Sequence, residues 1–148
     1  MYKHLLIATD GSELASKAVE HGLQLAADIG ARVTAIMVSE PVVLGTDDAF
    51  NLGLLASLDT DLRSDREQAA AKVFAPVTER AAAAGVSLDT VHVPDRHPAE
   101  AIVEMAEERG CDLVVMASHG RRGIGRLLLG SQTSEVLGRC TVPVLVIR

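Results

Sequence analysis

Short apolar runs alternate along this chain with longer segments whose apolar residues recur at helical spacing. The apolar runs lie at residues 5–8, 32–38, 113–117 and 142–147, a more polar alternating segment lies at residues 86–93, and each has the length of a strand. Such an alternation forces consecutive strands to lie parallel, because each connection is long enough to contain a helix. The sequence therefore predicts an α/β fold with a parallel sheet and helices on both faces.

Residues typical of helix ends bound the segments between the strands. Residues 10–13 (DGSE) offer N-cap candidates and an acidic first turn for a first helix, which Gly30 ends. Pro98 suits the first position of a later helix that ends at Gly110. The polar, alternating pattern of residues 86–93 indicates a strand near the edge of the sheet.

The middle of the chain is harder to interpret. Residues 39–57 fit neither period, and their Pro, Gly and Asp residues indicate a mobile loop that can contain a helical turn. A long helix is expected over residues 59–84, with a kink or a break at Pro76. Its expected inner face consists of Leu62, Ala69, Ala70, Val73, Phe74, Val77, Ala81 and Ala84.

Length and charge exclude several classes of protein. A chain of 148 residues is expected to form a single domain, and its net charge of −6 argues against binding nucleic acid, which requires clustered cations. The two cysteines, Cys111 and Cys140, lack the spacing of a metal site and predict free thiols in a reducing cytoplasm. No apolar run approaches the roughly 20 residues that cross a membrane, so no membrane partner is expected.

The segment from Met116 to Ser131, MASHGRRGIGRLLLGS, leads from an apolar strand into a helix that begins at Gly130-Ser131. A strand-to-helix turn presents unpaired backbone N–H groups and a helix N-terminus at one edge of a sheet. The guanidinium groups of Arg121, Arg122 and Arg126 lie within the same turn and can neutralise phosphate charge. The turn therefore predicts a phosphate site.

Several other phosphate-binding and catalytic motifs do not fit. Gly120 and Gly125 have the spacing of a P-loop, but Arg126 and Leu127 stand where that motif needs lysine and a hydroxyl. The first turn has one glycine, too few for a dinucleotide fingerprint, and no G-x-S-x-G motif is present. A phospho-acceptor site is not expected either, because Asp10 stands alone and no lysine follows Lys72.

Along essentially its whole length the chain resembles the universal stress proteins, members of the adenine-nucleotide α-hydrolase-like superfamily. The ATP-binding members carry Gly, two residues, Gly, nine residues, and then Gly-Ser or Gly-Thr. Here that pattern falls on Ala117, Gly120, Gly130 and Ser131, so three of four positions match. The methyl group of Ala117 is tolerated if this residue keeps a strand conformation, and it costs about 1 kcal/mol or more if φ is positive.

This resemblance implies a Rossmann-like open sheet of five parallel strands in the order 3-2-1-4-5, with helices on both faces. It also implies a site for ATP, or for ADP or AMP, at the carboxyl edge of the sheet, with Mg²⁺ accompanying the triphosphate. Adenosine would be contacted by Ala8, Thr9, Asp10, Val38 and Met116, and Asp10 would lie near the ribose or bind the metal. Phosphate contacts would come from Gly120, Gly130, Ser131 and Gln132. Further candidates for the nucleotide site are Ala117, His119, Arg121, Arg122 and Thr133, of which the two arginines are suggested by the turn itself and not by the resemblance.

Each of these residues also has a structural interpretation, which the sequence leaves open. Ser131 suits the N-cap of a helix in any protein, and Asp10 suits the cap of the first helix. Met116 has the character of a core residue. His119 and the arginine pair Arg121-Arg122 suit a solvated turn.

We expect a nucleotide-gated stress-response module rather than a metabolic enzyme. Nucleotide would order segments 39–57 and 120–130, changing a surface that partners read. A slow ATPase is the first alternative, with Asp10 as the only carboxylate at the site. A scaffold that has lost nucleotide binding is the second, and Ala117 favours it. Homodimerisation is expected through the apolar segment 142–147, with Val142 and Ile147 at its two ends.

Overall fold

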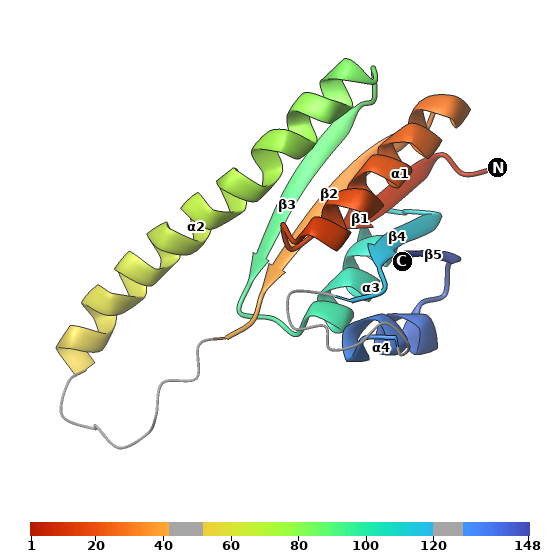
Figure 1. Ribbon diagram of the computed structural model, residues 1–148. Coiled ribbons are helices and arrows are strands. Elements are labelled where there is room, and N and C mark those ends of the chain that lie inside the picture. The colour runs from red at the N-terminus through yellow and green to blue at the C-terminus, as the bar shows by residue number, and fades with distance from the viewer. Residues whose placement is uncertain (42–51, 120–128) are drawn as a thin grey trace.

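Strands and helices alternate throughout the computed structural model, which describes residues 1–41, 52–119 and 129–148 (Figure 1). Side chains of residues 52–61 lie outside this description, as do residues 42–51 and 120–128 entirely. The elements are β1 His4–Ala8, α1 Glu13–Ile29, β2 Arg32–Ser39, α2 Leu52–Ala83, β3 Leu88–Pro94, α3 Pro98–Glu108, β4 Leu113–Ala117, α4 Ser131–Arg139 and β5 Val144–Ile147. This order confirms the predicted alternation.

The strands form one open parallel sheet in the order β3-β2-β1-β4-β5, as expected. Ile7 of β1 pairs with Ala35 of β2 on one side and with Val115 of β4 on the other. The chain adds β2 and β3 on one side of β1 and then returns to add β4 and β5 on the other. The order reverses between β1 and β4, and in open α/β sheets ligands bind beyond the carboxyl ends of the strands at such a reversal.

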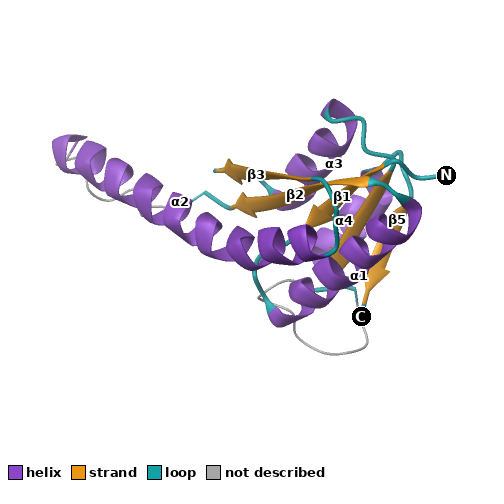
Figure 2. Ribbon diagram, turned by 90° about the horizontal axis from the view of Figure 1, so that it is seen from above, coloured by secondary structure: helices purple, strands orange, loops and turns teal. Residues whose placement is uncertain are grey.

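Two hydrophobic layers cover the sheet. Leu5 and Ile7 pack with α1 and α2 on one face, whereas Leu6 packs with α3 and α4 on the other. Figure 2 shows α1 and α2 on one side of the strands and α3 on the opposite side. All three of these β1 side chains are fully buried, which explains why the strand reads as a continuous apolar run.

The long helix α2 corrects two expectations. It begins at Leu52 and not near residue 59, because Leu and Ala dominate residues 52–58 and outweigh Gly53, which had indicated a loop. It also continues through Pro76 without a break. Phe74 and Val77 are buried on either side of that proline, so packing holds the helix together there. Its amino-terminal end extends beyond the sheet (Figure 1).

Not every residue expected on the inner face of α2 is buried. Ala70, Phe74, Val77 and Ala81 are buried and Val73 is half-buried against the same cluster, as predicted. Ala69 and Ala84 are exposed, so their assignment to the core was wrong. Ala69 and Ala70 are about 100° apart around the helix, so the helix can bury Ala70 against the sheet and leave Ala69 in solvent.

Capping residues fix where the other helices start and stop. Ser12 is the N-cap of α1, and its hydroxyl accepts a hydrogen bond from the Ala15 amide at 3.2 Å. Gly30 ends α1 in the left-handed conformation with φ of 69°, which glycine adopts at little cost. Pro98 opens α3 as predicted. The last strand begins at Val144 and not at Val142, and it forms the edge of the sheet.

The two cysteines are free thiols, as expected. Burial raises the pKa of the Cys111 thiol to about 11, so it remains protonated and unreactive at neutral pH. No helix in the described parts of the chain is both long enough and apolar enough to span a membrane.

A buried histidine ties together three elements at the amino end of the sheet. The His4 Nδ1–H donates to the Arg109 carbonyl oxygen at 3.1 Å, because a carbonyl can only accept. Its Nε2 therefore accepts from the Thr34 hydroxyl at 2.8 Å, which fixes the neutral tautomer. Burial, with a further contribution from the positive charge of Arg32, lowers the pKa of His4 below 6.5.

This lowered pKa predicts acid sensitivity of the fold. Neutral His4 contributes fully to the stability of the fold above pH 6.5, the ordinary pKa of the imidazole in the unfolded chain. This contribution is lost as the pH falls toward the lower pKa of His4 in the folded protein. One such proton changes the free energy of unfolding by at most about 1.4 kcal/mol per pH unit. Urea titrations between pH 7 and pH 5 should show that the free energy of unfolding falls more steeply with pH for the wild type than for His4→Gln. The exposed His21 provides the control, since His21→Gln should keep the wild-type slope.

Candidate functional site

The carboxyl ends of β1 and β2 are joined directly. The Thr9 amide donates to the Ile36 carbonyl oxygen at 2.9 Å, and Ala8 pairs with Ile36 in the parallel register. Just beyond them, Asp10 Oδ1 accepts from the Ser12 amide at 2.9 Å and closes the turn into α1. The N-cap is Ser12, so the interpretation of Asp10 as the cap of this helix was wrong.

The end of β4 is fastened to the first turn of α4. The Thr133 hydroxyl donates to the carbonyl oxygens of Ala117 and Ser118, at 3.1 Å each. Thr133 is only 2% exposed, so its hydroxyl lies inside the protein and not on a ligand-accessible surface. The Thr133 side chain therefore positions the turn, and because the whole residue is buried its backbone amide is covered as well.

Gly130 brings α4 close to β4. Its amide donates to the Ser118 carbonyl oxygen at 2.8 Å. A β-carbon at Gly130 would lie 3.1 Å from that same oxygen and 3.4 Å from the His119 α-carbon, which explains why glycine suits this position. The expectation that the Gly130 amide binds phosphate is not met in this structure, because that N–H already has an acceptor.

The first-turn amides of α4 that lack an acceptor in their own helix belong to Ser131, Gln132 and Thr133. The first intrahelical hydrogen bond of α4 runs from the Ser134 amide to the Gly130 carbonyl oxygen, so the three preceding N–H groups have no partner in their own helix. Gly130 is the N-cap and Ser131 is the first helical residue, which corrects the interpretation of Ser131 as a cap. Ser131 is exposed, so its hydroxyl and amide are accessible to a ligand.

The three helices that begin beyond β1, β3 and β4 differ in how their first turns are satisfied. The Ser12 hydroxyl caps α1, which also carries Glu13 in its first turn. Glu100 lies in the first turn of α3, and the Gln132 side chain accepts from its Ala99 amide. The first turn of α4 has no side-chain cap and no acidic residue. Among these helices α4 thus offers the most favourable N-terminus for an anion.

Ala117 adopts the tolerated conformation. It is the last residue of β4, and its φ is not among the positive values found in the described residues. Strand alternation places its side chain on the face of Val115, which packs against α1. The methyl group is buried there, and the backbone strain considered for this position is absent.

Side chains expected near adenosine are largely part of the core. Met116 is 6% exposed and packs in the hydrophobic layer under α3 and α4. Val38 and Ala8 are half-buried against the same layer. A ligand at this edge would therefore meet the backbone of Val38 and only the outer surface of its side chain.

The remaining expected residues divide into two groups. His119 is half-buried at the end of β4, where its Nδ1 lies 3.1 Å from the Ser118 hydroxyl oxygen. Gly120, Arg121, Arg122 and Arg126 fall outside the described residues, as does most of segment 39–57. In the described parts of the chain no three His, Cys, Asp or Glu side chains gather as a metal site.

One residue at the centre of this site was not singled out from the sequence. Ser118 is 3% exposed, and its carbonyl oxygen accepts from both the Gly130 amide and the Thr133 hydroxyl. Its own amide donates to the Ile147 carbonyl oxygen at 2.8 Å, linking the site to β5. Only its place directly after an apolar strand could have drawn attention to it.

Comparison with known proteins settles the family. A model of the universal stress protein family matches residues 1–148. The chain belongs to the universal stress protein family. The universal stress protein MJ0531 of Methanocaldococcus jannaschii is 34% identical over 150 residues, which cover 100% of this chain and 83% of the relative.

Solved structures of this family share the fold. The structure of MJ0577, also from Methanocaldococcus jannaschii, superposes with a TM-score of 0.83 at 26% identity and covers 99% of this chain and 96% of that one. A universal stress protein solved in complex with cAMP gives a TM-score of 0.68 at 26% identity, with coverage of 99% and 97%. An adenine nucleotide is thus bound by a structural neighbour of this universal stress protein.

Proposed function

We propose that this universal stress protein binds ATP, with ADP or AMP as related ligands of the same site, and acts as a nucleotide-gated stress-response module of the cytoplasm. The observation that carries the proposal is the open first turn of α4 at the strand-order reversal. Its amides at residues 131–133 have no partner in their own helix, and no carboxylate lies among them. The relative in complex with cAMP supports an adenine nucleotide as the ligand.

The proposed pose follows the carboxyl edge of the sheet. Phosphate groups would accept hydrogen bonds from the amides of Ser131 and Gln132 and from the Ser131 hydroxyl. Adenosine would lie over the ends of β1 and β2, where Ala8, Thr9 and the Val38 backbone form the rim. Glu13 makes the first turn of α1 acidic, which disfavours phosphate at that helix and so favours this orientation.

Among the described residues, Asp10 is the carboxylate that we propose for Mg²⁺. Asp10 is half-buried at the rim, and we propose that it approaches a magnesium ion carried by the triphosphate. That ion, when bound, would neutralise phosphate charge. No general base emerges among the other described residues of the rim, so binding is proposed in preference to hydrolysis.

We also propose a homodimer through β5. This strand forms the edge of the sheet, and its Leu145 side chain is 37% exposed. An apolar edge strand has unpaired backbone groups that a second copy can satisfy across a two-fold axis. Sedimentation at micromolar concentration should give the mass of a dimer, and a monomer would contradict this part of the proposal.

Calorimetric titration with ATP and Mg²⁺ tests the site directly, and Ser131→Asp sharpens the test. A carboxylate at the first position of α4 interacts favourably with the helix dipole and stabilises the fold by about 0.3–1 kcal/mol, whereas it repels phosphate. We therefore expect the variant to unfold at an equal or higher temperature than the wild type and to bind ATP at least tenfold more weakly, roughly the effect of one added like charge near phosphate.

Ser134→Asp is the matched control, because Ser134 is also exposed but donates its amide within the helix. It should bind ATP much more tightly than Ser131→Asp. Equal ATP affinity in Ser131→Asp and the wild type would show that the phosphates do not bind at the first turn of α4. A wild-type protein that shows no saturable ATP binding would instead be the scaffold that lacks nucleotide, an outcome that the Gly130–Ser118 hydrogen bond favours.

A further inference from the structure

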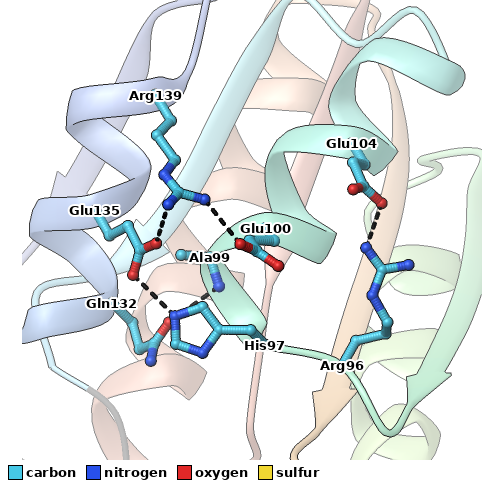
Figure 3. Close-up of polar contacts among 8 residues, drawn as sticks. All are labelled: Arg96, His97, Ala99, Glu100, Glu104, Gln132, Glu135 and Arg139. Carbon is cyan, nitrogen blue, oxygen red and sulfur yellow. Dashed lines mark hydrogen bonds and ion pairs between the residues drawn. The ribbon is translucent and has the colours of Figure 1, made fainter.

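The amino ends of α3 and α4 are joined by side chains that cross between them. Gln132, in the first turn of α4, accepts a hydrogen bond through its side-chain oxygen from the Ala99 amide of α3 at 3.0 Å (Figure 3). Ala99 is fully buried, and its N–H belongs to the first turn of α3, where no intrahelical acceptor exists. His97 is the N-cap of α3 but makes no side-chain cap hydrogen bond. The cap of α3 therefore comes from α4.

A second set of contacts holds the same two helices in register. His97 Nε2 lies 2.8 Å from a carboxylate oxygen of Glu135, and Arg139 contacts both Glu135, at 3.0 Å, and Glu100, at 3.1 Å. The hydrogen bond with His97 holds the pKa of Glu135 below its usual range, and Arg139 lowers it further. Figure 3 shows these side chains bridging the gap between α3 and α4.

The start of α3 is in turn attached to the end of β2. The Arg96 amide donates to the Ser39 carbonyl oxygen at 3.2 Å. The turn that contains Arg96 is also held from α2, because the carboxylate of Asp95 pairs with Arg66 at 2.7 Å. Asp95 has φ of 56°, a conformation that few residues other than glycine adopt. This turn is therefore a constrained link between β2 and α3.

These contacts form one continuous connection across the edge of the sheet. It runs from the first turn of α4, through Gln132 and Ala99, to Arg96 and then to Ser39 at the end of β2. The proposed phosphate side of the site stands at one end, and the proposed adenine side, beside Val38, stands at the other. Gln132 provides the contact of this connection that lies in the first turns of both helices, beside the ion pairs of Glu135 and Arg139 with α3 and its N-cap.

We infer that Gln132 is a positioning residue that sets the separation between the phosphate-binding turn and the adenine-binding rim, an inference that rests on the proposed function. Its backbone amide lies among the proposed phosphate donors while its side chain holds α3. Loss of the side-chain acceptor leaves the buried Ala99 N–H unpaired and lets α4 shift relative to β2. Ligands that span both sides then bind less tightly, whereas ligands that touch one side do not.

The test compares Gln132→Met, which keeps the length of the side chain and removes the acceptor, with the wild type. Affinities are measured by NMR titration for ATP, adenosine and inorganic triphosphate, each with Mg²⁺. We expect Gln132→Met to weaken ATP binding by about tenfold, as for the loss of one well-placed hydrogen bond, and to leave adenosine and triphosphate unchanged. Gln24→Met is the matched control, since Gln24 makes an exposed hydrogen bond on α1 and should keep the wild-type affinities.

Amide exchange of Ala99 provides a readout without any ligand. Exchange should be faster in Gln132→Met and return to the wild-type rate in Gln132→Glu, whose carboxylate is also an acceptor. Unchanged Ala99 exchange, unchanged ATP affinity, or an equal loss for adenosine and triphosphate in Gln132→Met would overturn the inference while ATP binding by the wild type stands. If the wild type itself binds no ATP, the proposed function fails first and this inference falls with it.

Discussion

Gly22→Leu should lower the free energy of unfolding by about 3 kcal/mol or more, because α1 touches the sheet at this residue. A β-carbon on Gly22 would lie 2.5 Å from Ile7 Cδ1, 3.1 Å from Ile7 Cγ1 and 3.4 Å from Val115 Cγ1. Ile7 and Val115 are both fully buried, so neither has open space to move into. A leucine side chain would force α1 away from β1 and β4 and open the layer between them.

Urea and thermal unfolding measure this effect. A loss of 3 kcal/mol in a chain of this length lowers the melting temperature by about 6–12 °C. Gly138→Leu is the matched control, because Gly138 is exposed in α4 and a β-carbon there would have nothing within 4 Å of it. That variant should be as stable as the wild type or slightly more so, since glycine inside a helix costs about 1 kcal/mol. A wild-type urea midpoint for Gly22→Leu would refute close packing at Gly22.

Local patterns were sufficient to predict the architecture. Each strand–helix unit carries its own signals, such as the buried run of β1, the polar turn before α1 and the left-handed glycine Gly30 after it. These signals agree with one another, and parallel pairing then follows from the length of the connections. The exception was α2, where Gly53 and Pro76 are strong local signals that neighbouring leucines, alanines and tertiary packing outweigh.

The placement of the candidate residues at one edge of the sheet was also predictable, but their hydrogen bonds were not. Parallel strands bring their carboxyl ends to one edge, so Asp10, Val38 and Ser131 could be assigned to that edge from the order of elements alone. Which amide faces a ligand depends on how closely α4 approaches β4. The Gly130 amide donates to Ser118, and the Thr133 hydroxyl is used inside the protein. No pattern in the sequence predicts how closely α4 approaches β4.

The contact between Gln132 and Ala99 illustrates the same limit. It joins residues 33 positions apart in the sequence. Pro98 indicated where α3 begins, but a proline at the first helical position does not say which group accepts from the next amide. Only the packing of α3 beside α4 reveals that the cap of one helix is supplied by the other.

Thr133→Val should both destabilise the fold and weaken ATP binding, because Thr133 fastens α4 to β4. Valine has the shape of threonine but leaves the Ala117 and Ser118 carbonyl oxygens without the hydroxyl that they share at 3.1 Å. Removing a hydrogen-bond partner from buried groups costs about 1–3 kcal/mol. The first turn of α4 would then be held to β4 chiefly by the Gly130 amide, so the proposed phosphate donors would lose their fixed orientation.

Two further variants separate this role from a general loss of stability. Thr133→Ser keeps the hydroxyl and should recover most of the ATP affinity, although it loses a buried methyl group. Thr141→Val removes an exposed hydroxyl that lies 3.4 Å from Glu107, and it should change stability by no more than about 0.5 kcal/mol. Affinities are compared at a temperature where every variant is folded. Wild-type ATP affinity in Thr133→Val would show that nucleotide binding does not depend on the contact between β4 and α4. The proposal that the first turn of α4 binds the phosphates would then be wrong.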